Sequence, residues 1–475
     1  MIKVTIDVIF SIIAIFTIAI SFFNCTGIYS QIFLLPIAYL IFHLSNKFIL
    51  KNSILLIEIV DFCAFLRYVI LPMVYSIEPT FSFSSYSCSS NFIMDDAIYL
   101  MFYELIVITL FLLVFKINSK KKLKDNGDIV EFSEKKNKGY KFIKLFIFVT
   151  LIMIAINPSV LTQFSFMIIQ SNTSVRIGAI SSSASSLDMI LRQFVLISIL
   201  FSYVISIIFI RDKYKDKKTY FAIVSSLILS FVCISIIVAE QRSTQIYCAF
   251  AAIVLLGRIY KEHRKLIISS LLFSCALIVS LLTIYKTFYV FNSSSYYESI
   301  FSSDAQFLKS LSYNLEVYLL GPQTVAAGIE FAEFNEVGIG QFLYDLFRPF
   351  IGISFLLKDT GMSLTSEIFN LYVTSGYSSG YLLPLTAHFY AFAGFISSPL
   401  LICAVYKCAY ELEKTMINSD SEFISFFAAY IYIRFATSMI CSNLATIMVS
   451  LSSILVSAGV VYCIQWIVGR VRFSK

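Results

Sequence analysis

Two side chains in the stretch from Ile237 to Tyr247, IVAEQRSTQIY, could take part in chemistry. Glu240 and Arg242 lie between two apolar runs, where a chain that crosses a membrane would turn back. The turn is short, so it would hold Arg242 at the outer end of the helix that follows. Glu240 could orient this arginine or act as an acid or a base. A charge fixed in this way suits a binding or catalytic site.

Arginine is unevenly distributed among the basic residues. Its guanidinium is a planar fork of donors that binds phosphate or carboxylate through two oxygens. An arginine at the centre of a span costs about 2.5–3.5 kcal/mol on insertion scales, so it needs a partner or a wet cavity. We predict an anion site from the six arginines on the outer side or in the outer half of a span, which are Arg67, Arg176, Arg192, Arg242, Arg348 and Arg434. The structural alternative is that they pair with Glu58, Asp61, Asp188 or Glu240, or extend to the outer headgroups.

The chain has three histidines, and one of them is predicted at the level of the arginines. His388, in YLLPLTAHFY, lies in the outer third of a predicted helix. A neutral imidazole at this depth could act as a general base. The alternative is a histidine that is hydrogen-bonded within the bundle. Glu240 is the second candidate for the base.

The elements that must position these residues are membrane helices. Hydrophobic residues make up 58% of the 475 residues and charged residues 14%. Such a composition exceeds what a soluble fold can bury, and apolar runs of spanning length recur along the chain. The sequence therefore predicts an all-α integral membrane protein with about twelve transmembrane helices, at 4–23, 29–45, 53–76, 97–115, 142–160, 187–210, 219–239, 243–257, 266–289, 382–406, 422–440 and 444–467.

The basic residues predict how these helices are oriented. With the amino terminus in the cytoplasm, 27 of the 36 lysines and arginines fall on the cytoplasmic side, as the positive-inside rule requires. An even number of spans places the carboxyl terminus there as well. The lysine-rich segment Lys116–Lys144 then sets topology, and we predict no nucleic-acid partner.

Two longer segments fall on the outer side, at 161–186 and 290–381. The chain divides into a nine-helix membrane segment (1–289), a large outer loop (290–381) and a three-helix membrane segment (382–475). Loops of this length are usually functional. Part of the larger loop, Phe342–Leu357, is apolar enough to lie on the membrane or dip into it.

Several motifs are absent from the sequence. There is no phosphate-binding GxxxxGK[ST] loop and no HExxH. No Asp-x-Asp pair is present to hold a nucleotide sugar through a metal. The ten cysteines are scattered, mostly inside apolar runs, which favours buried thiols. We predict neither a metal site nor a cofactor.

With this arrangement the chain resembles the Wzy-type polymerases of bacterial O-antigen and capsule repeat units. The resemblance covers most of the length and rests on the span pattern and on two outer loops bearing arginine. It also rests on the EQRS turn, the GPQTVAAGIEF segment and the glycine-rich stretch GYSSGYLLPLTAHFYAFAGF. The large loop departs from the family pattern because its acidic residues outnumber its basic ones.

The resemblance implies a GT-C-like membrane glycosyltransferase in the bacterial inner membrane, working without metal or nucleotide sugar. It implies that a glycan on undecaprenyl diphosphate is moved onto the terminal sugar of a newly flipped lipid-linked repeat, with a chain-length regulator as a partner. Fixed arginine forks would stabilise the leaving diphosphate. We expect Arg242, Arg434, Arg192 and Arg176 around the diphosphates, Arg348 contributing from the loop, and His388 or Glu240 as the base.

Two other functions stay open on the sequence. An O-antigen ligase would transfer the same donor to a lipid A core. A flippase for lipid-linked oligosaccharides should have short loops and charges along a central path, whereas the intramembrane arginines here cluster toward one predicted face.

Overall fold

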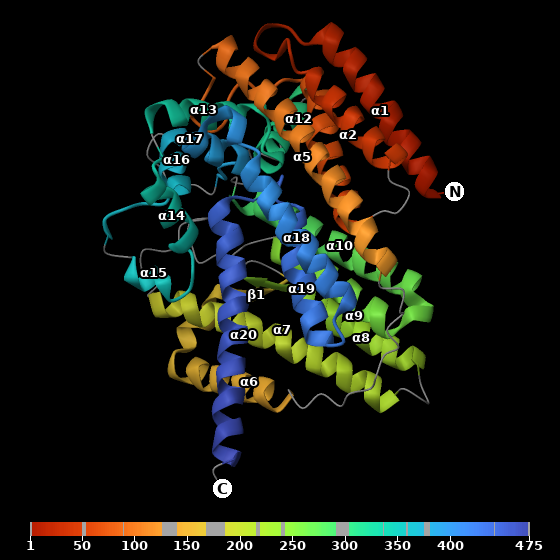
Figure 1. Cartoon of the computed structure of the whole chain (residues 1–475), viewed down its shortest axis with the longest axis vertical. Coiled ribbons are helices and arrows are strands. Elements are labelled where there is room, and N and C mark those ends of the chain that lie inside the picture. The colour runs from red at the N-terminus through yellow and green to blue at the C-terminus, as the bar shows by residue number, and fades with distance from the viewer. Residues whose placement is uncertain are drawn as a thin grey trace.

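Helices form most of the part of the chain that the structure describes (Figure 1). Each of the twelve predicted ranges overlaps a helix. The computed structural model describes residues 2–49, 54–88, 90–125, 140–167, 186–214, 219–238, 243–290, 304–335, 337–357, 360–374, 381–440 and 442–473.

The first helices form a bundle in which α2 packs between α1 and α5. α1 exposes Ile12, Phe16 and Phe23, as expected of a helix that faces lipid. A π-helical segment, η2, interrupts the third predicted span and carries Arg67; such segments are frequent at functional sites. The elements are α1 (Ile2–Asn24), η1 (Gly27–Tyr29), α2 (Leu34–Ile49), α3 (Leu55–Phe65), η2 (Leu66–Ile70), α4 (Leu71–Tyr75) and α5 (Asn91–Asp125).

The middle of the chain adds five more long helices and a small sheet in the described residues. These elements are α6 (Tyr140–Ile156), η3 (Pro158–Gln163), β1 (Phe164–Phe166), α7 (Ser186–Tyr214), α8 (Thr219–Ile234), β2 (Ile236–Val238), α9 (Ser243–Ile259), η4 (Lys261–His263) and α10 (Arg264–Val290). β1 and β2 pair antiparallel, with Phe164 opposite Val238. The predicted outer ends of spans 142–160 and 219–239 are wrong, because α6 ends at Ile156 and α8 ends at Ile234. Pro158 disfavours helical backbone at Asn157, where α6 has ended, and 236–238 is a strand.

The predicted large outer loop is helical in its described parts and packs onto the bundle. It contains α12 (Asp304–Leu319), α13 (Pro322–Phe334), α14 (Ile339–Phe347), α15 (Ile353–Leu356) and α16 (Thr365–Val373). Val325, Ala326 and Ile329 of α13 belong to the main hydrophobic core. A Cβ atom on Gly328 would lie 2.6 Å from the Ala387 Cβ, so glycine is what lets α13 approach α17 this closely. Figure 1 shows α13, α16 and α17 side by side at one end of the molecule.

The last segment contains α17 (Leu385–Ser397), α18 (Leu400–Asn418), α19 (Glu422–Ala436) and α20 (Leu444–Phe473). The prediction of one straight helix over 382–406 is wrong, because α17 and α18 are bent by 109° at the break between them. Gly394 has φ 76°, which glycine adopts without strain, and Pro399 precedes α18. α19 packs against α18 and α9.

The fold is that of an all-α membrane protein. Five helices in the described residues are long and apolar enough to cross a membrane, or six if the bent pair α17–α18 counts as one span. Four apolar helices are shorter, at Ile143–Ile156, Thr219–Ile234, Ser243–Ile259 and Leu444–Val460. The number of twelve spans is not confirmed and stays a prediction.

Candidate functional site

The most deeply buried arginine, Arg67, is paired with a carboxylate. Its Nη1 lies 3.1 Å from Oε2 of Glu104 on α5, and its Nε donates to the Leu320 carbonyl at 3.0 Å. Tyr68 and Thr386 donate their hydroxyls to the same carboxylate, at 3.1 and 2.6 Å. This Arg67–Glu104 pair therefore ties η2, α5 and α17 to the turn between α12 and α13. Since Glu104 balances the charge of Arg67, the contacts favour a structural role over the predicted anion role.

A second buried carboxylate, Glu316, holds the same turn from the other side. Tyr75 donates its hydroxyl to Oε2 at 2.5 Å, and the N–H and hydroxyl of Thr324 each donate to Oε1 at 2.7 Å. Leu320 has φ 54°, and a Cβ on Gly321 would lie 2.1 Å from Oε2. Burial raises the pKa of the Glu316 carboxyl, against the lowering effect of its hydrogen bonds. The predicted outer loop, whose helices α12 to α16 we call the outer segment, is thus fixed to the bundle through buried polar contacts.

His388 on α17 faces a carboxylate of the outer segment. Its Nε2 lies 3.1 Å from Oδ2 of Asp345 on α14, and both side chains are buried. The two atoms are at ion-pair distance, although neither Nε2 nor Oδ2 has a hydrogen-bond partner within the described residues. Asp345 is held by its other oxygen, which accepts from the Thr365 N–H at 2.9 Å. Phe342 packs against the imidazole.

The other imidazole nitrogen is also without a partner. Within the described residues, Nδ1 of His388 is buried and has no hydrogen-bond partner. In the tautomer that carries its proton on Nε2, next to Asp345, Nδ1 has a lone pair that could accept a proton. The arrangement is therefore competent for general-base chemistry, which is the role predicted for His388.

Two predicted arginines, Arg192 and Arg434, have no carboxylate partner among the described residues. Arg434 on α19 lies over the Tyr247 ring, 5.3 Å from its centroid, and donates through Nη1 to the Ser450 hydroxyl. Arg192 on α7 donates through Nη1 to Oε1 of Gln163 at 3.2 Å. In both, Nε is buried without a hydrogen-bond partner in the described residues. A partly buried guanidinium with neutral neighbours and a spare buried donor is suited to an anionic ligand.

Serines on α20 connect these arginines to the outer segment. Ser450 accepts from Arg434, Ser453 donates to Oε1 of Gln193 at 3.2 Å, and Ser452 accepts from the Ile351 N–H at 3.5 Å. Gln193 follows Arg192 on α7. We call Gln163, Arg192, Gln193, Arg434, Ser450 and Ser453 the polar junction; it joins α7, α19 and α20.

More unpartnered polar atoms lie close to the junction in the chain. The hydroxyls of Ser438 and Ser442, in the turn between α19 and α20, are buried without partners in the described ranges. The same holds for Oε1 of Gln245, two residues before the Tyr247 that stacks on Arg434. Unsatisfied buried polar atoms are costly, so a ligand or water that pairs with them would be stabilised here.

The other predicted site residues divide into two groups. Arg348 is partly buried at the end of α14, three residues after Asp345, and forms no ion pair in the part of the chain that the structure describes. Glu240, Arg242 and Arg176 lie outside the described residues. Within the described ranges, no cluster of His, Cys, Asp and Glu has the grouping of a metal site.

Sequence reasoning missed two buried carboxylate contacts at the predicted cytoplasmic end. Asp61, one of the predicted arginine partners, instead lies 2.8 Å from Nδ1 of His43, whose ring stacks on Tyr39. Glu413 on α18 accepts the Leu55 N–H at 2.9 Å at the start of α3. The spacing of His43 and Asp61 in the sequence carries no signal for their pairing, because it depends on how α2 and α3 pack.

Comparisons with known proteins leave the family of this chain open. No family model, no curated protein and no solved structure matches it.

Proposed function

We propose that this chain is a membrane glycosyltransferase that polymerises undecaprenyl-diphosphate-linked oligosaccharide repeat units at the periplasmic face of a bacterial inner membrane. The observation that carries the proposal is the polar junction. Two arginines, Arg192 and Arg434, have no carboxylate partner among the described residues, where the Nε of each is also buried without a hydrogen-bond partner. Partly buried guanidinium groups of this kind suit diphosphate, the leaving group of the proposed reaction.

The proposed chemistry divides between two groups of residues. The acceptor hydroxyl of one repeat attacks the anomeric carbon of the donor glycan, while the bond from that carbon to the diphosphate oxygen breaks. His388 takes the hydroxyl proton at Nδ1, and Asp345 stabilises the resulting imidazolium. Arg192 and Arg434 stabilise the negative charge that builds on the leaving diphosphate, with Arg242, Arg176 and Arg348 as further candidates. Glu240 stays the second candidate for the base.

The proposal includes the finer features of the membrane arrangement. These are about twelve spans in a GT-C-like bundle, both termini in the cytoplasm, and an outer segment that covers the site. Membrane lipid and a chain-length regulator are the proposed partners, with the lipid-linked oligosaccharide as substrate. The buried contacts of Arg67 and Glu316 with the turn between α12 and α13 support a rigid cover over the bundle.

Deletion of the gene in its host tests the assignment against its alternatives. A polymerase mutant still transfers a single repeat to lipid A core, so a one-repeat band is the expected result. If long chains accumulate on undecaprenyl diphosphate and no repeat reaches the core, the protein is the ligase. If lipid-linked single repeats stay on the cytoplasmic face, it is a flippase.

A further inference from the structure

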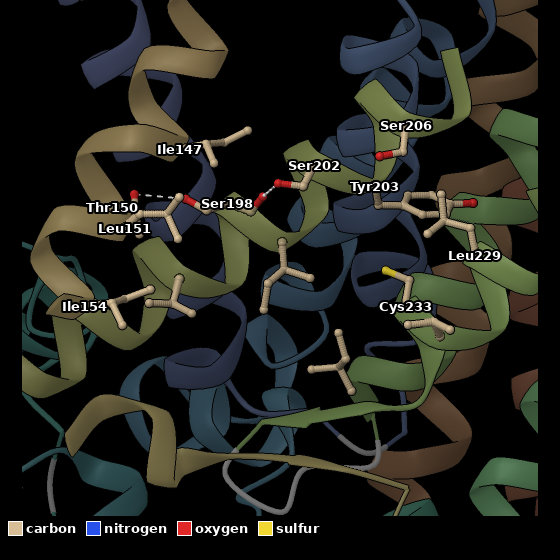
Figure 2. A pocket seen from close by; sticks show the side chains of 14 residues that line it. Ile147, Thr150, Leu151, Ile154, Ser198, Ser202, Tyr203, Ser206, Leu229 and Cys233 are labelled. Carbon is tan, nitrogen blue, oxygen red and sulfur yellow. Dashed lines mark hydrogen bonds between the residues drawn. The ribbon is translucent and has the colours of Figure 1, made fainter. Parts of the chain in front are cut away.

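One cavity of the described residues is a groove inside the apolar part of the bundle. It has a volume of about 270 Å³ and is lined by residues of α6, α7 and α8. Helices α6 and α8 both pack against α7. Figure 2 shows side chains of these helices, among them Ile154, Ser202 and Cys233, gathered around it. Two residues of its lining, Leu151 and Val232, are 57% and 39% exposed. The groove therefore opens sideways, toward the lipid.

Four of the five hydroxyls that line the groove, all but that of Ser206, are hydrogen-bonded to the protein itself. Ser198 donates to the Thr150 hydroxyl at 2.9 Å, and Thr150 donates to the Phe146 carbonyl at 2.9 Å. Ser202 donates to the Ser198 carbonyl at 2.8 Å. The Tyr203 hydroxyl is hydrogen-bonded to Ser230 at 2.7 Å. With these groups satisfied, the groove offers mainly apolar contact, so its occupant should be a hydrocarbon chain.

One face of α7 connects the groove to the polar junction. Val195, Ser202 and Ser206 line the groove, and Arg192 lies one turn before Val195 on the same face. From Val195 to Ser206 the groove runs along roughly 16 Å of helix, given the rise per residue. Arg192 does not line the groove itself; one turn beyond Val195, its Nε is buried without a hydrogen-bond partner in the described residues and its Nη1 donates to Gln163. An apolar groove with a cation one helical turn beyond it matches a long-chain lipid with an anionic headgroup.

We propose that this groove holds the polyprenyl chain of the lipid-linked substrate, with its phosphate group on Arg192. This inference rests on the proposed function, which supplies polyprenyl diphosphate as the lipid. The substrate would enter sideways from the bilayer past Leu151 and Val232, and its headgroup would reach the junction without crossing the bundle. A membrane phospholipid has the same combination of tail and anion, so the experiment must separate the two.

Filling the groove tests the proposal directly. Ser202→Phe places a ring in the groove, and Val232→Trp narrows its open side at a residue that already faces lipid. Ser269→Phe on α10 is the control, because Ser269 is exposed and its hydroxyl bonds only to its own helix. Purified protein in nanodiscs is labelled with a photoreactive polyprenyl diphosphate. Phosphatidylglycerol and inorganic diphosphate serve as competitors.

We expect labelling within the helical stretches that line the groove, Ile147–Ile154, Val195–Ser206 and Leu229–Ile236. Affinity should fall about tenfold in Ser202→Phe and Val232→Trp, as for loss of one buried apolar contact, and stay unchanged in Ser269→Phe. Labelling elsewhere, or equal affinity in the groove variants, overturns the proposal. Equal competition by phosphatidylglycerol also overturns it, since the groove would then be an ordinary lipid site. Specific labelling of the groove by a protein that forms no polymer overturns the proposed function and leaves this inference standing.

Discussion

The Nε2 atom of His388 lies 3.1 Å from Oδ2 of Asp345, and both side chains are buried where α17 meets the outer segment. Within the described residues Nδ1 of His388 has no hydrogen-bond partner, so it is the candidate atom to accept a proton. If His388 is the base, His388→Ala should lower the polymerisation rate by about 10²–10⁴-fold. Asp345→Asn keeps the shape and removes the charge, so it should lower the rate while the protein stays folded.

The second buried histidine provides a matched control. His43 is as buried as His388 and also faces a carboxylate, Asp61, at the predicted cytoplasmic end. His43→Gln should reduce thermal stability and leave the rate per folded molecule unchanged. Equal rate losses in His43→Gln and His388→Ala would show that the effect is structural.

The arginines of the polar junction should be sensitive to a change of donor geometry. Arg434→Lys keeps the charge and loses the fork, so we expect it to weaken diphosphate binding nearly as much as Arg434→Ala. The loss of a charged hydrogen bond, about 1.5–3 kcal/mol, corresponds to roughly 10- to 150-fold in affinity. Isothermal titration with polyprenyl diphosphate measures this. Arg211→Lys is the control, because Arg211 pairs with Glu422. Full affinity in Arg434→Lys would show that diphosphate binding does not depend on the forked donor geometry of the guanidinium.

Arg67 should behave as a structural residue. Breaking a buried ion pair by removing one partner costs about 3–5 kcal/mol, so Arg67→Met and Glu104→Met should each unfold readily. The double variant should regain much of the loss, because no buried charge is left alone. Melting temperatures of the three variants in detergent test this. A stable double variant that binds no diphosphate would instead restore the anion role predicted for Arg67.

Glu316 gives a pH dependence with a defined sign. Burial raises its pKa in the folded state, so the folded protein binds more protons than the unfolded one. Its contribution is fully present below the ordinary glutamate pKa of about 4.3 and is lost as the pH rises through the raised value. Glu316→Gln resembles the protonated acid and can keep the contacts with Thr324 and Tyr75. The variant should therefore match the wild type in acid and be more stable near neutral pH. A melting temperature difference that does not change with pH would contradict this.

The close approach of α13 and α17 should depend on Gly328. An added Cβ would lie 2.6 Å from the Ala387 Cβ, so Gly328→Ala should destabilise the protein by about 1–3 kcal/mol through overpacking. Because α17 carries His388, the rate should fall as well. Gly340→Ala on α14 is the control, since a Cβ there meets nothing within 4 Å. Equal melting temperatures for the two variants would show that α13 and α17 can separate freely.

The sequence predicted where the helices lie, but it did not predict which side chains pair with one another. Hydropathy located the helical ranges because each apolar run is a local signal. It missed the bend between α17 and α18, where the run continues although Gly394 and Pro399 break the helix. It also missed β2, because a strand of three apolar residues at the end of a helix has no pattern of its own.

The candidate site was predicted residue by residue and not as an arrangement. Arg192, Arg434 and His388 were chosen for their type and expected depth, and their predicted roles stay predictions; in the described ranges neither arginine has a carboxylate partner. Arg67 was chosen in the same way and pairs with Glu104, which was not among the predicted partners. Pairings such as Arg67–Glu104 and Asp345–His388 join residues far apart in the chain, so they follow from helix packing.

The most direct test of the central claim is polymerisation by the purified chain. The protein is reconstituted into liposomes with its host's lipid-linked repeat unit, and the products are separated by size. We predict a ladder of lengthening glycans on undecaprenyl diphosphate with release of free undecaprenyl diphosphate, and no ladder with His388→Ala. A reconstituted, folded protein that leaves the single repeats unjoined would contradict the account.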